Sequence, residues 1–160
     1  MTQDFRAAVE LDDMDRAILR VLQRHGRMTH SDLSERVHLS PSACHRRVQR
    51  LEQAGVIADY VALLNPRAVA RVTTVFVEIK LQGQSDEILD AFEKAVARVP
   101  DVLECHLMAG SADYLLKVAA RDSEDFARIH RQHLARLPGV AQMQSSFALK
   151  TVFKTTALPV

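Results

Sequence analysis

The composition of this 160-residue chain is that of a globular protein, with room for one domain or two small ones. Hydrophobic residues make up 48% and charged residues 26% of the sequence, which excludes a disordered chain. No apolar run reaches the length of a membrane span, and the first residues lack a signal-peptide pattern, so we expect a cytoplasmic protein with no membrane partner. Because the net charge is only +1, contact with nucleic acid would require a local basic patch.

Two short helices are predicted before residue 40. Residues 11–22 carry apolar side chains at helical spacing, and their acidic side chains lie at the N-terminal end, where the helix dipole favours them. Residues 29–37 form the second helix. Thr29 is placed to cap its start, and Leu33 and Val37 form an apolar pair one turn apart.

A third helix follows the turn Leu39–Pro41 and ends before Gly55. Cys44, Val48 and Leu51 face a core, whereas the residues that point away from it are Ser42, His45, Arg46, Gln49 and Arg50. Between His45 and Arg50 the helix contains three arginines and no acidic residue. Two helices joined by a tight turn are typical of a helix-turn-helix, whose second helix enters the major groove.

We therefore expect the outward face of this helix to bind double-stranded DNA through phosphates and base edges. The residues expected at the interface are Thr29, Ser31, Ser40, Ser42, His45, Arg46, Arg47, Gln49 and Arg50. Among them, Arg46, Arg47 and Arg50 are expected to supply the positive charge. The alternative is a solvated, arginine-rich surface helix without a partner.

Val56 to Leu64 can add a β-ribbon or wing to the three helices. Asn65-Pro66 marks a boundary, because proline disfavours the continuation of either element. We expect a DNA-binding domain at residues 1–64, a wing or linker at about residues 56–71, and a second domain at residues 72–160.

The second domain alternates strands and helices in the order β-α-β-β-α-β. The expected elements lie at residues 72–81, 85–99, 102–108, 113–120, 123–137 and 140–155, with Ser85 and Ser123 as helix N-caps. Residues 140–155 are expected to form one long strand or two. This order predicts an α+β domain with the ferredoxin-like split βαβ arrangement. Helices cover only one face of such a sheet, and Phe76 falls on the other face, so we expect a face-to-face dimer.

The turn between the second and third strands is the best candidate for a small-molecule site. Gly110 permits close backbone approach, the backbone N–H groups of the turn can bind a carboxylate, and Asp113 can bind an ammonium group, as an α-amino acid requires. The residues expected there are Met108, Ala109, Gly110, Ser111, Asp113, Tyr114, Gln144, Ser145 and Ser146. The alternative is an ordinary hairpin turn in which Asp113 caps its own backbone.

No catalytic or metal-binding pattern competes with these two sites. His130 and His133 could share a helix face, but they lack a clear third ligand, and the sequence has neither a Gly-rich phosphate loop nor a nucleophile elbow. We therefore expect neither an enzyme nor a resident cofactor. Cys44 and Cys105 fall on expected core faces and are predicted to be buried, reduced thiols.

Many spaced positions of the chain match one family of proteins. In the first half they are Leu11-Asp12, Asp15-Arg16, Ile18-Leu19, Gly26-Arg27, Leu39-Ser40-Pro41, Cys44, Arg47, Leu51-Glu52, Gly55-Val56-Ile57 and Tyr60. In the second half they are Glu104-Cys105-His106, Gly110, Asp113-Tyr114-Leu115-Leu116-Lys117 and Leu137-Pro138-Gly139-Val140. The chain thus resembles the Lrp/AsnC, or feast/famine, family of bacterial and archaeal transcription regulators, and most of all its leucine-responsive branch. Ser111-Ala112 and Ser145-Ser146 depart from the family pattern.

The resemblance implies an N-terminal winged helix-turn-helix and a C-terminal βαββαβ domain, called RAM, that dimerises and assembles into octamers of four dimers. It also implies that a small amino acid such as leucine binds between dimers near Gly110–Tyr114 and changes assembly or DNA affinity. We therefore expect a sequence-specific, nucleoid-associated regulator of amino-acid metabolism genes. Two alternatives stay open: a nucleoid-organising protein that wraps DNA without an effector, and an enzyme subunit whose RAM-like domain regulates flux.

Overall fold

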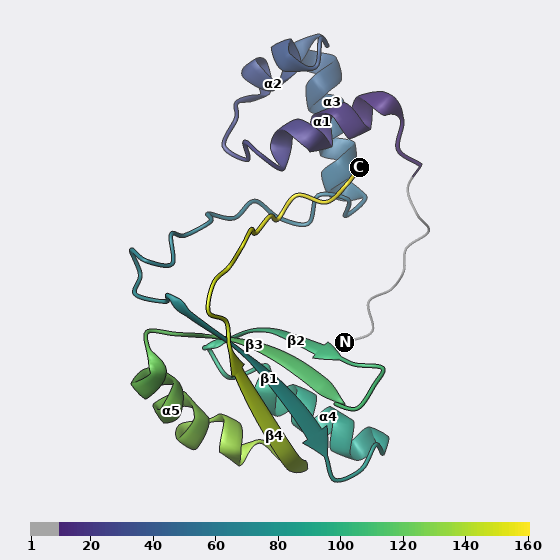
Figure 1. Ribbon diagram of the computed structural model, residues 1–160. Helices are drawn as coiled ribbons and strands as arrows, with labels where there is room; N and C mark the ends of the chain where they lie inside the picture. Colours follow the sequence, from purple (N-terminus) through teal and green to yellow (C-terminus); the bar gives the residue numbers. More distant parts are fainter. Residues whose placement is uncertain (1–9) are drawn as a thin grey trace. The chain divides into compact units, whose positions relative to one another are not determined.

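The structure, a computed structural model, describes residues 10–160 and places them in two compact units, each with its own hydrophobic core (Figure 1). The first unit extends to Leu63 and also includes Phe153–Val160, whereas the second unit is Leu64–Val152. From the sequence we expect the second domain to continue to residue 160. The structure instead groups the final residues with the helices of the first unit.

Hydrogen bonds to the first helix account for this placement of the final residues. Arg20 Nε donates to the Val160 carbonyl oxygen at 2.8 Å, and Gln23 Nε2 donates to the Leu158 carbonyl oxygen at 3.1 Å. The side chain of Val160 also packs against the core of the first unit. These contacts join residues far apart in the sequence, so no local pattern could predict them.

Three helices form the first unit: α1 (Asp13–Leu22), α2 (His30–Arg36) and α3 (Pro41–Gln53). They confirm the three helices expected from the sequence. Each helix starts at a residue whose side chain accepts a hydrogen bond from the backbone N–H three positions on, and these capping residues are Asp12, Thr29 and Ser40. The core side chains come from all three helices and include Ile18, Leu33, Cys44, Val48 and Leu51.

No strand forms between α3 and the second unit, so the expected ribbon or wing at residues 56–64 is absent from the described chain. Residues 61–70 are all exposed, and within one copy of the chain their backbone groups have no neighbouring strand to pair with. The segment instead contains a turn in which the Arg71 N–H donates to the Pro66 carbonyl oxygen at 2.7 Å.

The second unit confirms the expected βαββαβ order. Its elements are β1 (Thr73–Leu81), α4 (Asp86–Val96), β2 (Val102–Leu107), β3 (Tyr114–Ala120), α5 (Ser123–Gln132), the 3-10 turn η1 (Leu134–Arg136) and β4 (Val140–Phe147). The strands pair in the order β2-β3-β1-β4, and every neighbouring pair is antiparallel. Both helices lie on one face of this sheet (Figure 1).

Strand β1 shows how the two faces of the sheet differ. Val75, Val77 and Ile79 are fully buried and share one core with the aromatic side chains of α4 and α5. The intervening residues project from the opposite face, which we call the open face. Phe76 lies there with 40% of its surface exposed.

Two element ends differ from the expectation. The N-cap of α5 is Asp122, not Ser123, because the Asp122 carboxylate accepts the Asp125 N–H at 2.8 Å. A carboxylate is also favoured there by the helix dipole. The sequence predicts one long strand or two over residues 140–155, but β4 ends at Phe147 and no strand follows it in the described chain.

The helix expected at residues 123–137 also ends early, and α5 gives way at His133 to the 3-10 turn. Ser85 does occupy the N-cap position of α4, but its side chain makes no capping hydrogen bond. Cys44 is buried as predicted, whereas Cys105 is exposed. The burial prediction for Cys105 was wrong because β2 is an edge strand, where helices cover the sheet less completely.

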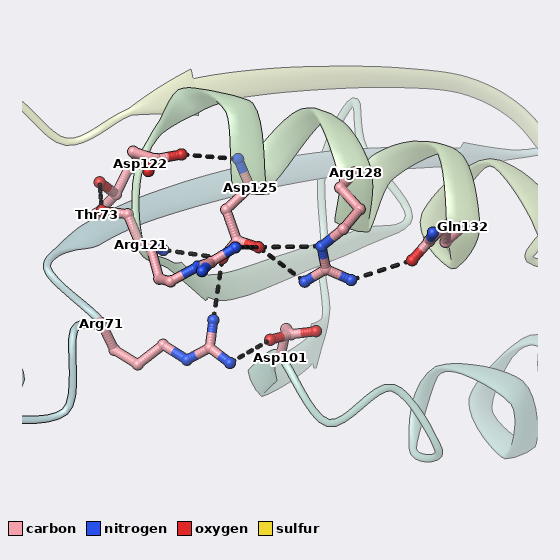
Figure 2. Close-up of polar contacts among 8 residues, drawn as sticks. All are labelled: Arg71, Thr73, Asp101, Arg121, Asp122, Asp125, Arg128 and Gln132. Carbon is pink, nitrogen blue, oxygen red and sulfur yellow. Dashed lines mark hydrogen bonds and ion pairs between the residues drawn. The ribbon is translucent and has the colours of Figure 1, made fainter.

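The start of α5 is tied to Arg71, two residues before β1, by a cluster of charges (Figure 2). The buried Asp125 carboxylate accepts hydrogen bonds from the Arg71 side chain at 3.0 Å, the Arg121 N–H at 3.0 Å and the Arg128 side chain at 2.7 Å. The Arg121 backbone bond foremost, and then the Arg128 side-chain bond, hold the pKa of Asp125 well below its usual range. Arg71 also forms an ion pair with Asp101 at 3.3 Å.

Candidate nucleic-acid interface and effector site

Helix α3 presents one apolar and one polar face, as the sequence predicts. Cys44, Val48 and Leu51 are buried in the core of the first unit. The residues expected at DNA that are exposed on or beside this helix are Ser40, Ser42, His45, Arg46, Gln49 and Arg50. The pattern suits insertion of the polar face into a groove, with hydrogen-bonding groups directed at base edges.

The arginines of α3 do not all have the same role in the structure. Arg47 donates to Asp12 at 2.7 Å and to Asp15 at 2.9 Å, and Arg50 also forms an ion pair with Asp15. The Asp15 side chain is completely buried, so these guanidinium groups compensate a charge inside the protein. Arg46 is exposed and takes part in no ion pair within residues 10–160.

The carboxylate of Asp12 belongs to the same cluster. It accepts the Asp15 backbone N–H at 2.8 Å and the Arg47 hydrogen bond, and these contacts lower the pKa of Asp12 to about 2. Arg47 in turn has a raised pKa because Asp12 and Asp15 surround it. The Asp12–Arg47 pair therefore remains ionised at neutral pH and fixes α3 against the start of α1.

The remaining residues expected at DNA lie around the starts of α2 and α3. Thr29 Oγ1 and Ser40 Oγ are occupied as helix caps, accepting backbone N–H groups at 3.2 Å and 3.3 Å. Ser31 is exposed on α2. The His45 ring meets the His30 ring edge-on, with centroids 5.0 Å apart, which joins the exposed surfaces of the two helices.

The β2–β3 hairpin forms the turn at which an effector is expected. Met108, Ala109, Gly110 and Ser111 are exposed there. Gly110 does not adopt positive φ, and a Cβ atom built on it would meet nothing within 4 Å. Within a single copy, a larger residue would therefore fit at this position. The Met108 N–H closes the hairpin by donating to the Asp113 carbonyl oxygen at 2.9 Å.

Asp113, expected to bind an ammonium group, already has partners within the protein. It is buried, and its carboxylate accepts the Leu81 N–H and the Gln84 side-chain amide, both at 2.7 Å. These two bonds lower its pKa. Tyr114 is also buried and donates its hydroxyl hydrogen to Glu93 at 2.7 Å, on the helix-covered face. Both side chains thus support the hairpin from inside.

A small hollow of about 170 Å³ lies on the open face beside this hairpin. We call it the hairpin pocket, and its side-chain lining consists of Glu78, Lys80, Ser111, Ala112, Gln142 and Gln144. Of the residues expected at an effector, only Ser111 and Gln144 line it. Ser146 lies further along the same face, whereas Ser145 lies opposite Val77 and points to the other face.

Sequence reasoning missed Glu78, Lys80 and Gln142 as pocket residues. Their signal was present, because alternate positions of β1 and of the last strand share one face. The missing information was the register, which sets Glu78 opposite Gln144 and Lys80 opposite Gln142.

Two sequence profiles match the two units of the chain. The profile described as winged helix-turn-helix DNA-binding matches residues 11–58, and the one described as Lrp/AsnC ligand binding domain matches residues 74–158. The chain belongs to the Lrp/AsnC family. The leucine-responsive regulatory protein of Escherichia coli K12 is 39% identical over 153 residues, which cover 96% of this chain and 93% of that protein.

Solved structures of family members share this fold. A transcriptional regulator of Neisseria meningitidis, crystallised as an L-methionine complex, is 40% identical with a TM-score of 0.89, covering 94% of this chain and 97% of that one. An AsnC family regulator of Agrobacterium tumefaciens is 38% identical with a TM-score of 0.90, covering 93% and 97%.

Family membership establishes the general activity of the chain. It is a DNA-binding transcriptional regulator with a ligand-binding domain, and not an enzyme. Within residues 10–160, no helix has the length and apolar character needed to cross a bilayer. The same residues contain no group of three His, Cys, Asp or Glu side chains placed to hold a metal ion.

Proposed function

We propose that this Lrp/AsnC regulator binds specific DNA sequences through α3 and that a small amino acid, bound beside the β2–β3 hairpin, changes its assembly or its affinity for DNA. The genes that it controls would then serve amino-acid metabolism. The single observation that carries the effector is the hairpin pocket, a polar hollow of single-amino-acid size in the unit that matches a ligand-binding domain.

Support for DNA recognition comes from the polar face of α3. Its exposed arginine, glutamine, histidine and serine side chains combine phosphate-binding with base-reading groups. A single copy makes few phosphate contacts, because Arg47 and Arg50 are engaged with acidic residues of α1. Tight binding at physiological salt therefore requires at least two copies on one DNA.

Self-association is the second part of the proposal. The open face of the sheet exposes Phe76, and β3 adds the partly exposed Leu115 to it. Packing of two such faces would remove this apolar surface from water and present two α3 helices together. Octamers of four dimers are the family-like assembly to test for. Through assembly, an amino acid can change DNA affinity only if it binds one assembly more tightly than another.

The experiment is a DNA-binding titration at fixed salt with the duplex upstream of the protein's own gene. A scrambled duplex of equal length and composition is the control, and each titration is repeated with single amino acids, beginning with L-leucine and L-methionine. We expect tighter binding to the upstream duplex and a shift with at least one amino acid.

Two other outcomes would contradict the proposal. Equal affinity for both duplexes, with no response to any amino acid, would favour the nucleoid-organising alternative. Specific binding that no amino acid changes would leave the sequence-specific regulator in place and remove the effector.

A further inference from the structure

Two histidines form an aromatic pair across the two helices of the helix-turn-helix. His30 is the first residue of α2, and His45 lies in the first half of α3, on its polar face. Their ring centroids are 5.0 Å apart and their planes are inclined by 80°, which is an edge-on arrangement. Both residues are exposed, so the pair lies on the surface of the first unit and not in its core.

The backbone beneath both rings is held in place by the fold. Thr29 Oγ1 accepts the Asp32 N–H at 3.2 Å and so fixes the start of α2, where His30 lies. Leu33 of α2 and Cys44 of α3 are buried in one hydrophobic core, which fixes the two helices against each other. The distance between the rings is therefore set by the packing of the helix-turn-helix.

The polar atoms of this pair have no partner within the described part of the chain. There, His106 is the one histidine whose side chain takes part in an ion pair or a hydrogen bond. The ring nitrogens of His30 and His45 are therefore free for a partner outside the protein. Their contact with each other fixes the orientation of the rings and leaves this hydrogen-bonding capacity unused.

We propose that His30 is a positioning residue, which holds the His45 ring in the orientation that reads one base pair in the major groove. His30 does not touch that base pair and acts through His45 alone. The inference rests on the proposed function, because it requires sequence-specific binding through α3. It assigns a determinant of specificity to α2, outside the helix that enters the groove.

The edge-on contact favours one orientation of the His45 ring before DNA binds. Aromatic pairs of this geometry favour the paired arrangement by roughly two- to tenfold, beyond the effect of the area that they bury. An exposed ring without a partner loses its rotamer freedom only on binding, and this loss weakens the contact that it makes. Because His30 restricts the ring in advance, His45 loses less freedom when it meets a base.

Discrimination among bases depends on this orientation. A neutral imidazole has one N–H donor and one acceptor nitrogen, and each base pair presents its own pattern of donors and acceptors in the major groove. A fixed ring directs its donor and acceptor at one pattern, whereas a mobile ring can turn toward the groups of another base. Loss of His30 should therefore lower the preference for one base pair more than the general affinity for DNA, which phosphate contacts supply.

The test begins with a selection from a library of random duplexes, which defines the site preferred by the full-length, unmodified protein. Fluorescence anisotropy titrations with labelled duplexes, at one pH and one salt concentration, then compare this site with each of its single-base-pair variants. We expect His45→Ala to abolish the preference at one base pair. His30→Ala should reduce the preference at the same base pair by roughly threefold and leave the preference at the other positions unchanged.

Three further variants separate positioning from a general change in the protein. His30→Phe keeps an aromatic ring beside His45 and should restore the preference that His30→Ala loses. The double variant of His30→Ala and His45→Ala should discriminate no less than His45→Ala alone, because His30 acts through His45. The matched control is His25→Ala, which removes an exposed histidine of the same unit and should leave the preference at every base pair unchanged. Thermal unfolding of each variant checks that the first unit remains folded.

The other outcomes overturn the inference, and they separate it from the proposed function. An equal loss of affinity for every duplex in His30→Ala would make His30 a phosphate contact. A loss of preference at a base pair that His45→Ala does not affect would make His30 a base contact of its own. If a site is selected and His30→Ala leaves its preferences unchanged, the sequence-specific regulator stands and the role of His30 falls. If the unmodified protein selects no site, sequence-specific binding and the inference fail together.

Discussion

Asp15 is a completely buried carboxylate near the start of α1, and two arginines of the recognition helix α3 compensate it. This pairing divides the arginines of α3 by role. Arg47 and Arg50 hold α3 in place, whereas Arg46 is exposed and free to contact a phosphate or a base. The sequence does not distinguish these three arginines, since all are basic and lie within five positions of one helix.

The division of roles predicts opposite phenotypes for neighbouring residues. Arg47→Met should destabilise the protein by about 1–2 kcal/mol, because it leaves the buried Asp15 carboxylate with Arg50 as its one charged partner beside the Asp12 backbone N–H. The loss stays modest because the Arg47 side chain is partly exposed to solvent. Arg46→Met should leave stability unchanged, weaken DNA binding and lower the salt slope by about one. Urea unfolding and DNA titrations over a salt series measure the two effects. Equal stability of both variants would contradict the structural role of Arg47.

At the scale of elements, Arg71 anchors the turn at residues 65–71 to the rest of the second unit. The side chain of Arg71 bridges Asp125 at the start of α5 and Asp101 before β2 (Figure 2). Asp125 keeps two further arginine partners, Arg121 and Arg128, if Arg71 is removed. The turn therefore depends on Arg71 more than α5 does.

Arg71→Gln should release this turn without unfolding α5. Amide hydrogen exchange, followed by mass spectrometry, should become faster at Ala68 and Arg71, whose N–H groups close the turn, and remain unchanged at Phe126 and Ile129 of α5. Arg67→Gln, in the same turn, is the charge-matched control. Faster exchange throughout α5 would instead show that Arg71 supports the whole second unit.

At the scale of the whole molecule, the second unit has one sheet face covered by helices and one open face. Phe76 is 40% exposed in the middle of the open face, and Leu107 is 64% exposed on the edge strand β2. Leu107 lies opposite the buried Tyr114, so it points toward the helix-covered side. The two residues therefore test the two surfaces separately.

Phe76→Lys should convert the proposed dimer to monomers, because it places a charge in the proposed contact between open faces. Leu107→Lys introduces the same charge at a more exposed apolar residue and should leave the dimer intact. Sedimentation velocity at several protein concentrations distinguishes the two results. A dimer that survives Phe76→Lys but not Leu107→Lys would move the interface to the edge of the sheet.

Local rules of sequence determined most of the architecture. The N-caps Thr29 and Ser40, the helical spacing of Cys44, Val48 and Leu51, and the alternation along β1 each reflect the geometry of one element. The order of these elements along the chain then predicts the βαββαβ unit, because a helix between two strands brings the chain back to the same sheet. One local prediction was wrong by a single residue: the N-cap of α5 is Asp122 and not Ser123.

Only the tertiary structure decided what individual polar residues do. The burial of Asp15 beneath Arg47, the use of Asp113 by Leu81 and Gln84, and the docking of Val160 on the first unit all join segments distant in the chain. The hairpin pocket likewise exists because the β1–β4 register brings Glu78 to Gln144. A sequence pattern reports which face a residue occupies, but the charge that remains free for a ligand or for DNA depends on partners supplied by the folded chain.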